Sequence, residues 1–141
     1  MNGRVRWWPS AVLACVLTAA GCAPLPMIAS PCHSGEIAMT RTVLYFGRSR
    51  PGGTVSDVEW RQFVAEIIVP RLPQGFTVSA ALGYWTDQAG HALEEASSLV
   101  TILHSPTPTL AQAIAEISAQ YKVRFQQESV LREHVSICAH W

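Results

Sequence analysis

The chain has 141 residues, which is enough for one domain, and its ten Lys and Arg residues balance its ten Asp and Glu residues. Arg4 and Arg6 lie in an N-terminal leader, and without them eight basic residues stand against ten acidic ones. The sequence has no basic patch or arm, so a nucleic-acid partner has no electrostatic support.

The first 21 residues have the three parts of an export signal. The two leader arginines supply positive charge, residues 11–20 (AVLACVLTAA) form an apolar run too short to span a bilayer, and small residues lead into Cys22. The sequence Ala19-Ala20-Gly21-Cys22 resembles the lipobox of bacterial lipoproteins, whose cysteine becomes the acylated N-terminus. The departure is Ala19, where that pattern usually has Leu.

We therefore predict a signal peptide at 1–21, a lipid such as palmitate on Cys22, and a protein anchored in the cell envelope facing the periplasm. Ala23 is not an aspartate, which by the same resemblance favours the outer membrane if the host has two membranes. The alternative is a plain secretory signal, cleaved for instance after Ala23, that releases the protein into the periplasm.

Two cysteines remain for the folded part, because Cys15 lies in the leader and Cys22 is the proposed lipid site. In an oxidising compartment Cys32 and Cys138 are expected to form a disulfide, and the alternative is two free thiols. No CxxC or HxxxH spacing accompanies them, so we expect no metal site.

The elements of the domain follow a proline-rich tether, which we place at 22–40, and the domain itself is placed at 41–141. Residues 42–48 (TVLYFGR) are β-branched and aromatic and predict a strand. Residues 56–69 predict a helix, because Ser56 and Glu59 have capping-box spacing and an apolar face recurs at helical spacing. Pro70 is expected to end this helix.

Two strands, a helix and a last strand follow. Residues 76–86 and 97–104 predict a hairpin with its turn at 87–90, and a capping box at Thr109 and Gln112 predicts the start of the second helix. Residues 130–138 predict the last strand.

The order β-α-β-β-α-β predicts an α+β, ferredoxin-like fold, in which two helices cover one face of a four-stranded antiparallel sheet. The first and last strands are neighbours in that topology. Cys32 and Cys138 would therefore lie at the same end of the sheet.

Five segments carry a family resemblance. They are Leu44-Tyr45-Phe46-Gly47-Arg48, residues 70–77 (PRLPQGFT), Gly83-Tyr84-Trp85, Glu95-Ala96-Ser97 and residues 125–132 (FQQESVLR). Over about residues 42–138 the chain resembles the domain of unknown function 3574 family of exported bacterial proteins. The resemblance implies no known activity. Glu94 and Ser98 stand where the family usually has basic residues, so an anion-binding role at those two positions is not expected here.

The helix-free face of the sheet is the candidate binding surface, because such a face is seldom left bare. Side chains alternate along a strand, so in the last strand we expect Leu131, Val135 and Ile137 to face the helices and Arg132 and His134 to face away. The candidate binding residues are Tyr45, Trp85, Glu128, Arg132 and His134. The alternative is a structural ion pair for Glu128 and Arg132, and packing or an interface for Trp85.

No catalytic residue is assigned from the sequence. His104, His134 and Glu95 match no metal motif, Ser97 lacks the elbow of a nucleophilic serine, and the glycines form no phosphate loop, so no cofactor is expected. We predict a non-enzymatic envelope module that binds a small molecule or a protein partner through the open sheet face, as a homodimer. The alternative is a small dimeric enzyme with a pocket between the sheet and its partner.

Acylation is the first testable prediction. Because the cysteine amine and thiol are both modified in lipoproteins, intact mass spectrometry of protein purified from membranes should show lipid on Cys22 and no residue before it. Cys22→Ala should move the protein from the membrane pellet to the soluble envelope fraction. An unmodified N-terminus at any other residue would contradict the lipoprotein assignment.

Overall fold

The computed structural model describes residues 32–86 and 90–140. Its main sheet is antiparallel, with the order β4-β5-β1-β6, and consists of β1 (Ile37–Gly47), β4 (Thr77–Thr86), β5 (Ala92–His104) and β6 (Leu131–Ala139). Two very short strands, β2 (Ser49–Arg50) and β3 (Gly53–Thr54), form a small hairpin after β1. The predicted signal peptide, Cys22 and most of the predicted turn at 87–90 lie outside the described residues.

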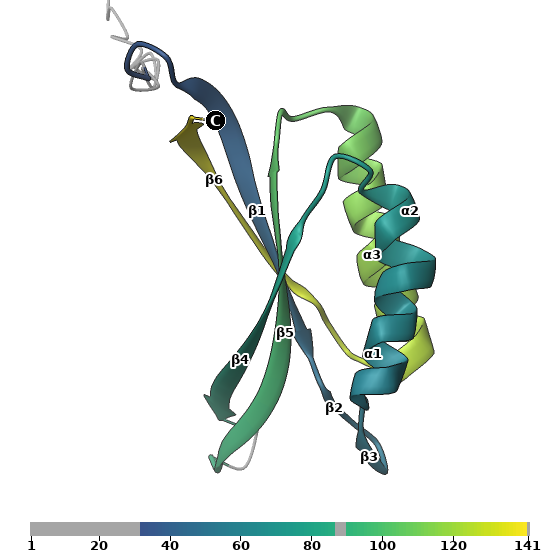
Figure 1. Cartoon of the computed structure of the whole chain (residues 1–141). Coiled ribbons are helices and arrows are strands. Elements are labelled where there is room, and N and C mark those ends of the chain that lie inside the picture. The colour runs from purple at the N-terminus through teal and green to yellow at the C-terminus, as the bar shows by residue number, and fades with distance from the viewer. Residues whose placement is uncertain (1–31, 87–89, 141) are drawn as a thin grey trace, which may run out of the picture. The chain divides into compact units, whose positions relative to one another are not determined.

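Two helical segments cover one face of this twisted sheet, and the other face carries no helix (Figure 1). The first consists of α1 (Asp57–Phe63), a π-helical turn (Val64–Ile68) and α2 (Val69–Arg71), and the second is α3 (Pro108–Phe125). The predicted ferredoxin-like α+β fold is confirmed. No helix among the described residues combines the length and hydrophobicity that crossing a membrane requires.

The core lies between the sheet and the helices and is rich in aromatic rings. The centroids of neighbouring rings lie 4.7 to 6.1 Å apart in a cluster formed by Phe46, Trp60, Phe63, Tyr121 and Phe125. These side chains are almost fully buried. Tilted and edge-to-face contacts at such distances add about 0.5–1.5 kcal/mol per pair to the hydrophobic gain.

The first helix begins as predicted but does not end at Pro70. Ser56 caps it with the expected capping box to Glu59. In the π-helical turn the N–H of Val69 donates to the carbonyl of Val64. After Pro70 the N–H of Leu72 donates to the carbonyl of Ile68 at 3.0 Å. The missing N–H of Pro70 therefore falls where the regular hydrogen-bond pattern is already interrupted, so the helix continues to Arg71.

The second helix is capped two residues earlier than predicted, at Thr107 rather than Thr109. The Thr107 hydroxyl accepts the N–H of Leu110 at 3.2 Å, and Pro108 occupies the first turn, where its fixed φ favours a helix. The predicted cap at Thr109 is therefore wrong. Thr107 lacks the Glu or Gln three residues later that marks a capping box, which is why the sequence pattern pointed to Thr109.

Strand register corrects the predicted orientation of the last strand. Arg132 lies opposite Leu44 and His134 opposite Thr42, and directly paired residues of antiparallel strands share a face. Leu44 and Thr42 are buried on the helix side, so Arg132 and His134 are on that side too. Leu131, Val135 and Ile137 lie on the helix-free face. β6 is an edge strand, and most of its residues are exposed. Its hydrophobic pattern therefore does not indicate which face of the strand is turned towards the helices.

Two of the strands, β1 and β5, are longer than predicted. β1 begins at Ile37, within the segment assigned to the tether, and β5 begins at Ala92 rather than at residue 97. Residues 92–96 (ALEEA) have no β-branched side chain, but pairing with β4 holds them in the strand.

A disulfide joins Cys32 to Cys138, as expected, with a Cα–Cα distance of 5.6 Å. It closes the domain at the end where β1 begins and β6 ends, since Ala38 lies opposite Cys138. For a sequence separation of 106 residues, the chain-entropy model gives an upper stabilisation of about 4–5 kcal/mol.

The capping box generates a prediction about acid stability. The Ser56 hydroxyl, the Ser56 N–H and Arg50 together lower the pKa of Glu59 to about 2. In the unfolded chain a glutamate titrates near ~4.3. Because the native pKa is the lower one, this contribution is fully present above about pH 5 and is lost as the pH falls towards 2.

Glu59→Gln removes the negative charge but keeps the hydrogen bonds of the cap, because a glutamine can also complete a capping box. The wild type should exceed this variant in free energy of unfolding at pH 6, and the difference should fade between about pH 5 and pH 2. Urea unfolding across this range provides the measurement. A difference that stays constant with pH would contradict the assignment.

Candidate functional site

The β4–β5 hairpin extends beyond the end of β1 and forms one wall of a groove on the helix-free face. β1 ends at Gly47, opposite Ser97, whereas β5 and β4 continue to pair as far as Ala92 and Thr86. The groove has a volume of about 580 Å³. Its opposite wall is the connection between α3 and β6, residues 126–129. We call it the Glu95 groove, after the carboxylate on its floor.

Small residues make the floor of the Glu95 groove. Gly47, Gly83 and Ser97 line it, and Glu95 lies directly opposite Gly83. A Cβ at Gly47 would lie 2.5 Å from Oε1 of Glu95, so the carboxylate occupies the space that any other residue at position 47 would fill. The absence of a side chain at Gly47 therefore sets the position of Glu95.

Ser49 holds this carboxylate from the side. Its backbone N–H donates to Oε1 of Glu95 at 2.9 Å, and its backbone carbonyl accepts a hydrogen bond from the Gln127 side chain. Three segments far apart in sequence are thereby joined at the groove. Among the described residues no donor contacts Oε2 of Glu95, so this oxygen remains available to a ligand.

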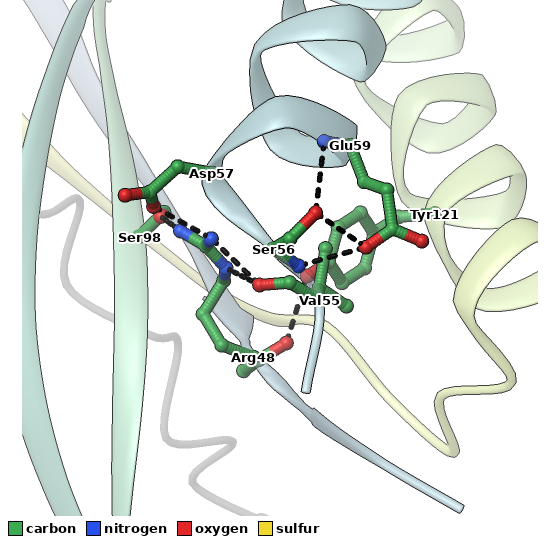
Figure 2. Close-up of polar contacts among 8 residues, drawn as sticks. Arg48, Val55, Ser56, Asp57, Glu59, Ser98 and Tyr121 are labelled. Atoms are coloured by element: carbon green, nitrogen blue, oxygen red, sulfur yellow. Dashed lines mark hydrogen bonds and ion pairs between the residues drawn. The ribbon is translucent and has the colours of Figure 1, made fainter. Parts of the chain in front are cut away.

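On the other side of the same strand end, Arg48 fixes the loop that carries Ser49 (Figure 2). Nε and Nη2 donate to the carbonyl of Val55 at 2.8 and 2.7 Å, Nη1 donates to Ser98 at 3.1 Å, and Nη2 pairs with Asp57 at 3.0 Å. The Arg48 side chain is only 13% exposed. All three guanidinium nitrogens therefore have acceptors, as a buried charge requires.

Tyr121 adds a second support from α3. Its hydroxyl donates to the carbonyl of Gly47 at 2.8 Å, and burial raises the pKa of Tyr121 to about 12. The phenol therefore keeps its proton and its role as donor at any physiological pH. Gly47 is thus held on the helix side by Tyr121 and contacted on the groove side by Glu95.

Aromatic rings form the rim of the groove. Tyr45 and Trp85 line it from the helix-free face, and Trp85 is 53% exposed. Tyr84 also lines it, but its side chain lies beside Glu94 on the other face of the hairpin. Burial and the nearby Glu133 carboxylate raise the pKa of the Tyr45 phenol. Tyr84 donates to Glu94 at 2.6 Å, which raises the pKa of Tyr84 as well. Both phenols are therefore neutral near pH 7.

The charged groups that line the groove are mainly acidic. Glu95 and Glu128 are both present, and the one arginine among the described lining residues is Arg50. Arg50 is engaged by Glu59 at 2.9 Å and lies 6.0 Å from the ring centroid of Phe125. The groove therefore offers two carboxylates and the aromatic rings of Tyr45 and Trp85 to a ligand.

Three of the five candidate binding residues come together in this groove, namely Tyr45, Trp85 and Glu128. The other two, Arg132 and His134, lie on the helix side of β6 and do not line it. Glu95 was not among the candidates. The signal for it was the Glu95-Ala96-Ser97 segment, but the close approach to Gly47 that marks it depends on strand register.

His104 and the two cysteines, which were considered for metal binding, are engaged in protein contacts. Nδ1 of His104 lies 3.1 Å from the carbonyl of Ser105 and donates to it, and Nε2 lies 2.9 Å from the hydroxyl of Thr42. Cys32, Glu36 and Cys138 place ligand atoms near one another, but both sulfurs are in the disulfide.

Comparisons with known proteins identify a family and a fold. The family model of a protein of unknown function, DUF3574, matches residues 41–141, so the chain belongs to this family. No curated protein matches the chain. A phage SAM lyase in complex with S-methyl-5'-thioadenosine is similar in structure, with a TM-score of 0.52 and 17% identity over 79% of this chain and 95% of the lyase. A phage SAM lyase in the apo state gives a TM-score of 0.52 and 18% identity over 74% and 92% of the two chains.

Proposed function

We propose that this member of the DUF3574 family is a lipid-anchored envelope protein that binds a small organic cation in the Glu95 groove without transforming it. The observation that carries the proposal is the fixed carboxylate of Glu95. It lies on a floor of small residues, held by Ser49, beneath a rim of aromatic rings.

The charge of the groove favours a cation over an anion. Two carboxylates line it, and Arg50 is paired with Glu59 rather than with the groove. An anion would meet repulsion from Glu95 and Glu128, whereas an ammonium or sulfonium group could pair with the open oxygen of Glu95.

The aromatic rings of the rim would contribute to cation binding as well. A cation close to the face of Tyr or Trp gains about 0.5–2 kcal/mol, depending on how well it is desolvated. Trp85 and Tyr45 also offer flat apolar surfaces for an attached ring. The expected ligand is therefore an organic cation with an apolar or aromatic part, not a metal ion.

The proposed location is the periplasmic surface of a membrane, the outer one where the host has two. The proposed anchor Cys22 lies ten residues before Cys32, the cysteine that closes the domain. The groove lies at the end of β1 remote from that disulfide.

A second copy of the chain is the proposed cover of the open face. Ile37, Leu93, Leu103, Leu131 and Val135 are large apolar side chains exposed on it. Together with Trp85 they form an apolar patch, and an exposed apolar patch often marks an interface with another protein.

Binding can be tested with S-adenosylmethionine, choline and spermidine as cationic probes and S-methyl-5'-thioadenosine as an uncharged one. Isothermal titration should detect at least one cationic probe and a weaker response to the uncharged one. Glu95→Gln should weaken cation binding about tenfold, the usual effect of losing a charge-assisted hydrogen bond. Gly47→Ala should have a similar effect, because its Cβ would displace the carboxylate.

The matched control is Glu66→Gln, which removes one negative charge from the helix surface, where Glu66 pairs with Arg124. It should leave binding unchanged. If no cationic probe binds in the millimolar range, or if Glu95→Gln and Glu66→Gln bind equally well, the proposed function is wrong.

The second candidate is an enzyme, which the similarity of fold to the phage SAM lyase structures favours. Glu95, Glu128 and Tyr45 supply several ionisable groups around one groove, as a catalytic site requires. Water could attack the side-chain carbon next to the sulfonium of S-adenosylmethionine, and the C–S bond would break with its electron pair going to sulfur. The products would be S-methyl-5'-thioadenosine, homoserine and a proton. If the chain is such an enzyme, chromatography with mass detection should show this nucleoside accumulating with the wild type and not with Glu95→Gln. The binding-only proposal predicts no accumulation above the rate without protein.

A further inference from the structure

A second hollow, of about 480 Å³, lies at the other end of the domain from the Glu95 groove. It is formed where the connection from α2 to β4 approaches the connection from β5 to α3, two loops at the same end of the molecule (Figure 1). Arg71, Pro73 and Gln74 line it. They belong to the PRLPQGFT segment, which the Glu95 groove does not use. We call this hollow the Arg71 pocket.

The interior of the Arg71 pocket is mainly apolar. Its apolar lining comes from the α2–β4 connection, α3 and the two central strands, through Pro73, Leu110, Ala113, Met39 and Leu103. Its volume is within the ~300–1,000 Å³ range of pockets that bind small organic molecules. A ligand with an apolar chain would therefore be desolvated there.

The polar edge of the pocket carries a single fixed charge. Arg71 donates from Nη1 to the carbonyl of Ile67 at 3.1 Å and from Nε to Glu116 at 3.3 Å. Within the described part of the chain Nη2 has no acceptor, so it can donate to a ligand. Gln74 adds an amide at the same edge.

The other ionisable group in the lining is already engaged within the protein. Both ring nitrogens of His104 contact protein groups, Thr42 and the carbonyl of Ser105. No described lining residue is a carboxylate. The nearest competing acid is Glu116, which already contacts Arg71.

We propose that the Arg71 pocket binds an amphipathic carboxylate of the fatty-acid class. The apolar chain lies along Pro73 and Leu110, and the carboxylate pairs with Arg71, displacing part of its contact with Glu116. The guanidinium matches a carboxylate in shape and charge, and the apolar interior excludes a purely polar anion. This site is independent of the Glu95 groove and of its proposed function.

Decanoate serves as the probe, with decanol as its uncharged counterpart, and isothermal titration measures both against the folded, disulfide-bonded domain. Wild-type protein should bind decanoate saturably and more tightly than decanol. Arg71→Gln should weaken decanoate binding about tenfold and leave decanol unchanged. Glu116→Gln should tighten decanoate binding severalfold, because it removes the acid that competes for Arg71.

The chain offers a closely matched control for Arg71→Gln. Arg124 pairs with Glu66 between the same two helical segments, and the side-chain exposures are 30% and 48%, against 29% and 47% for Arg71 and Glu116. Arg124→Gln should therefore lower the melting temperature about as much as Arg71→Gln, without changing decanoate affinity. Glu95→Gln should also leave decanoate affinity unchanged.

Three outcomes would overturn the proposal. They are an absence of saturable decanoate binding in the millimolar range, equal affinity in the Arg71→Gln and Arg124→Gln variants, and weaker binding in Glu116→Gln. A filling variant, Ala113→Leu, gives an independent check, since it should reduce the affinity for decanoate and decanol alike. Unchanged binding of both in that variant would place the ligand elsewhere.

Discussion

Both the fold and the candidate site depend on the hydrogen bonds of the Arg48 side chain, which is mostly buried. Its guanidinium joins β5 through Ser98, the loop before α1 through Val55, and α1 itself through Asp57. Loss of the Ser98 hydroxyl would leave Nη1 of this largely buried guanidinium without an acceptor, which costs more than the hydrogen bond itself contributes. The loop from Ser49 to Val55 is therefore held in place, and its first residue holds Glu95 on the opposite face of the sheet. A contact on the helix side thus determines the geometry of the groove.

The fold was predictable because local signals and topology agreed. The capping box at Ser56, the apolar helix faces and the alternating strands each indicated the right type of element, and their order then indicated the sheet. The sequence did not predict the secondary structure of residues that depends on contacts outside their own segment. Pro70 continues a helix because of the π-helical turn before it, and residues 92–96 form a strand because β4 lies beside them. Neither cause is visible within the segment itself.

The candidate site was only partly predictable, for a related physical reason. Tyr45, Trp85 and Glu128 lie in segments that were singled out, and the structure brings them to one groove. Arg132 and His134 were assigned to the wrong face, since an edge strand exposes both of its faces and its pattern does not distinguish them. The register of strand pairing determines which side chains lie on which face, and a shift of one residue would exchange every side chain between the faces. The contact between Glu95 and Gly47 depends on register in the same way.

The two most distinctive sequence segments serve opposite ends of the domain. Residues 126–129 form a wall of the Glu95 groove, whereas residues 71, 73 and 74 line the Arg71 pocket. β1, with 11 residues, runs between these ends over about 35 Å, well beyond a Debye length at physiological salt. The acidic groove and the pocket with its single arginine therefore act as separate electrostatic environments. The different charges of their linings follow from local residues, Glu95 and Glu128 in the groove and Arg71 in the pocket.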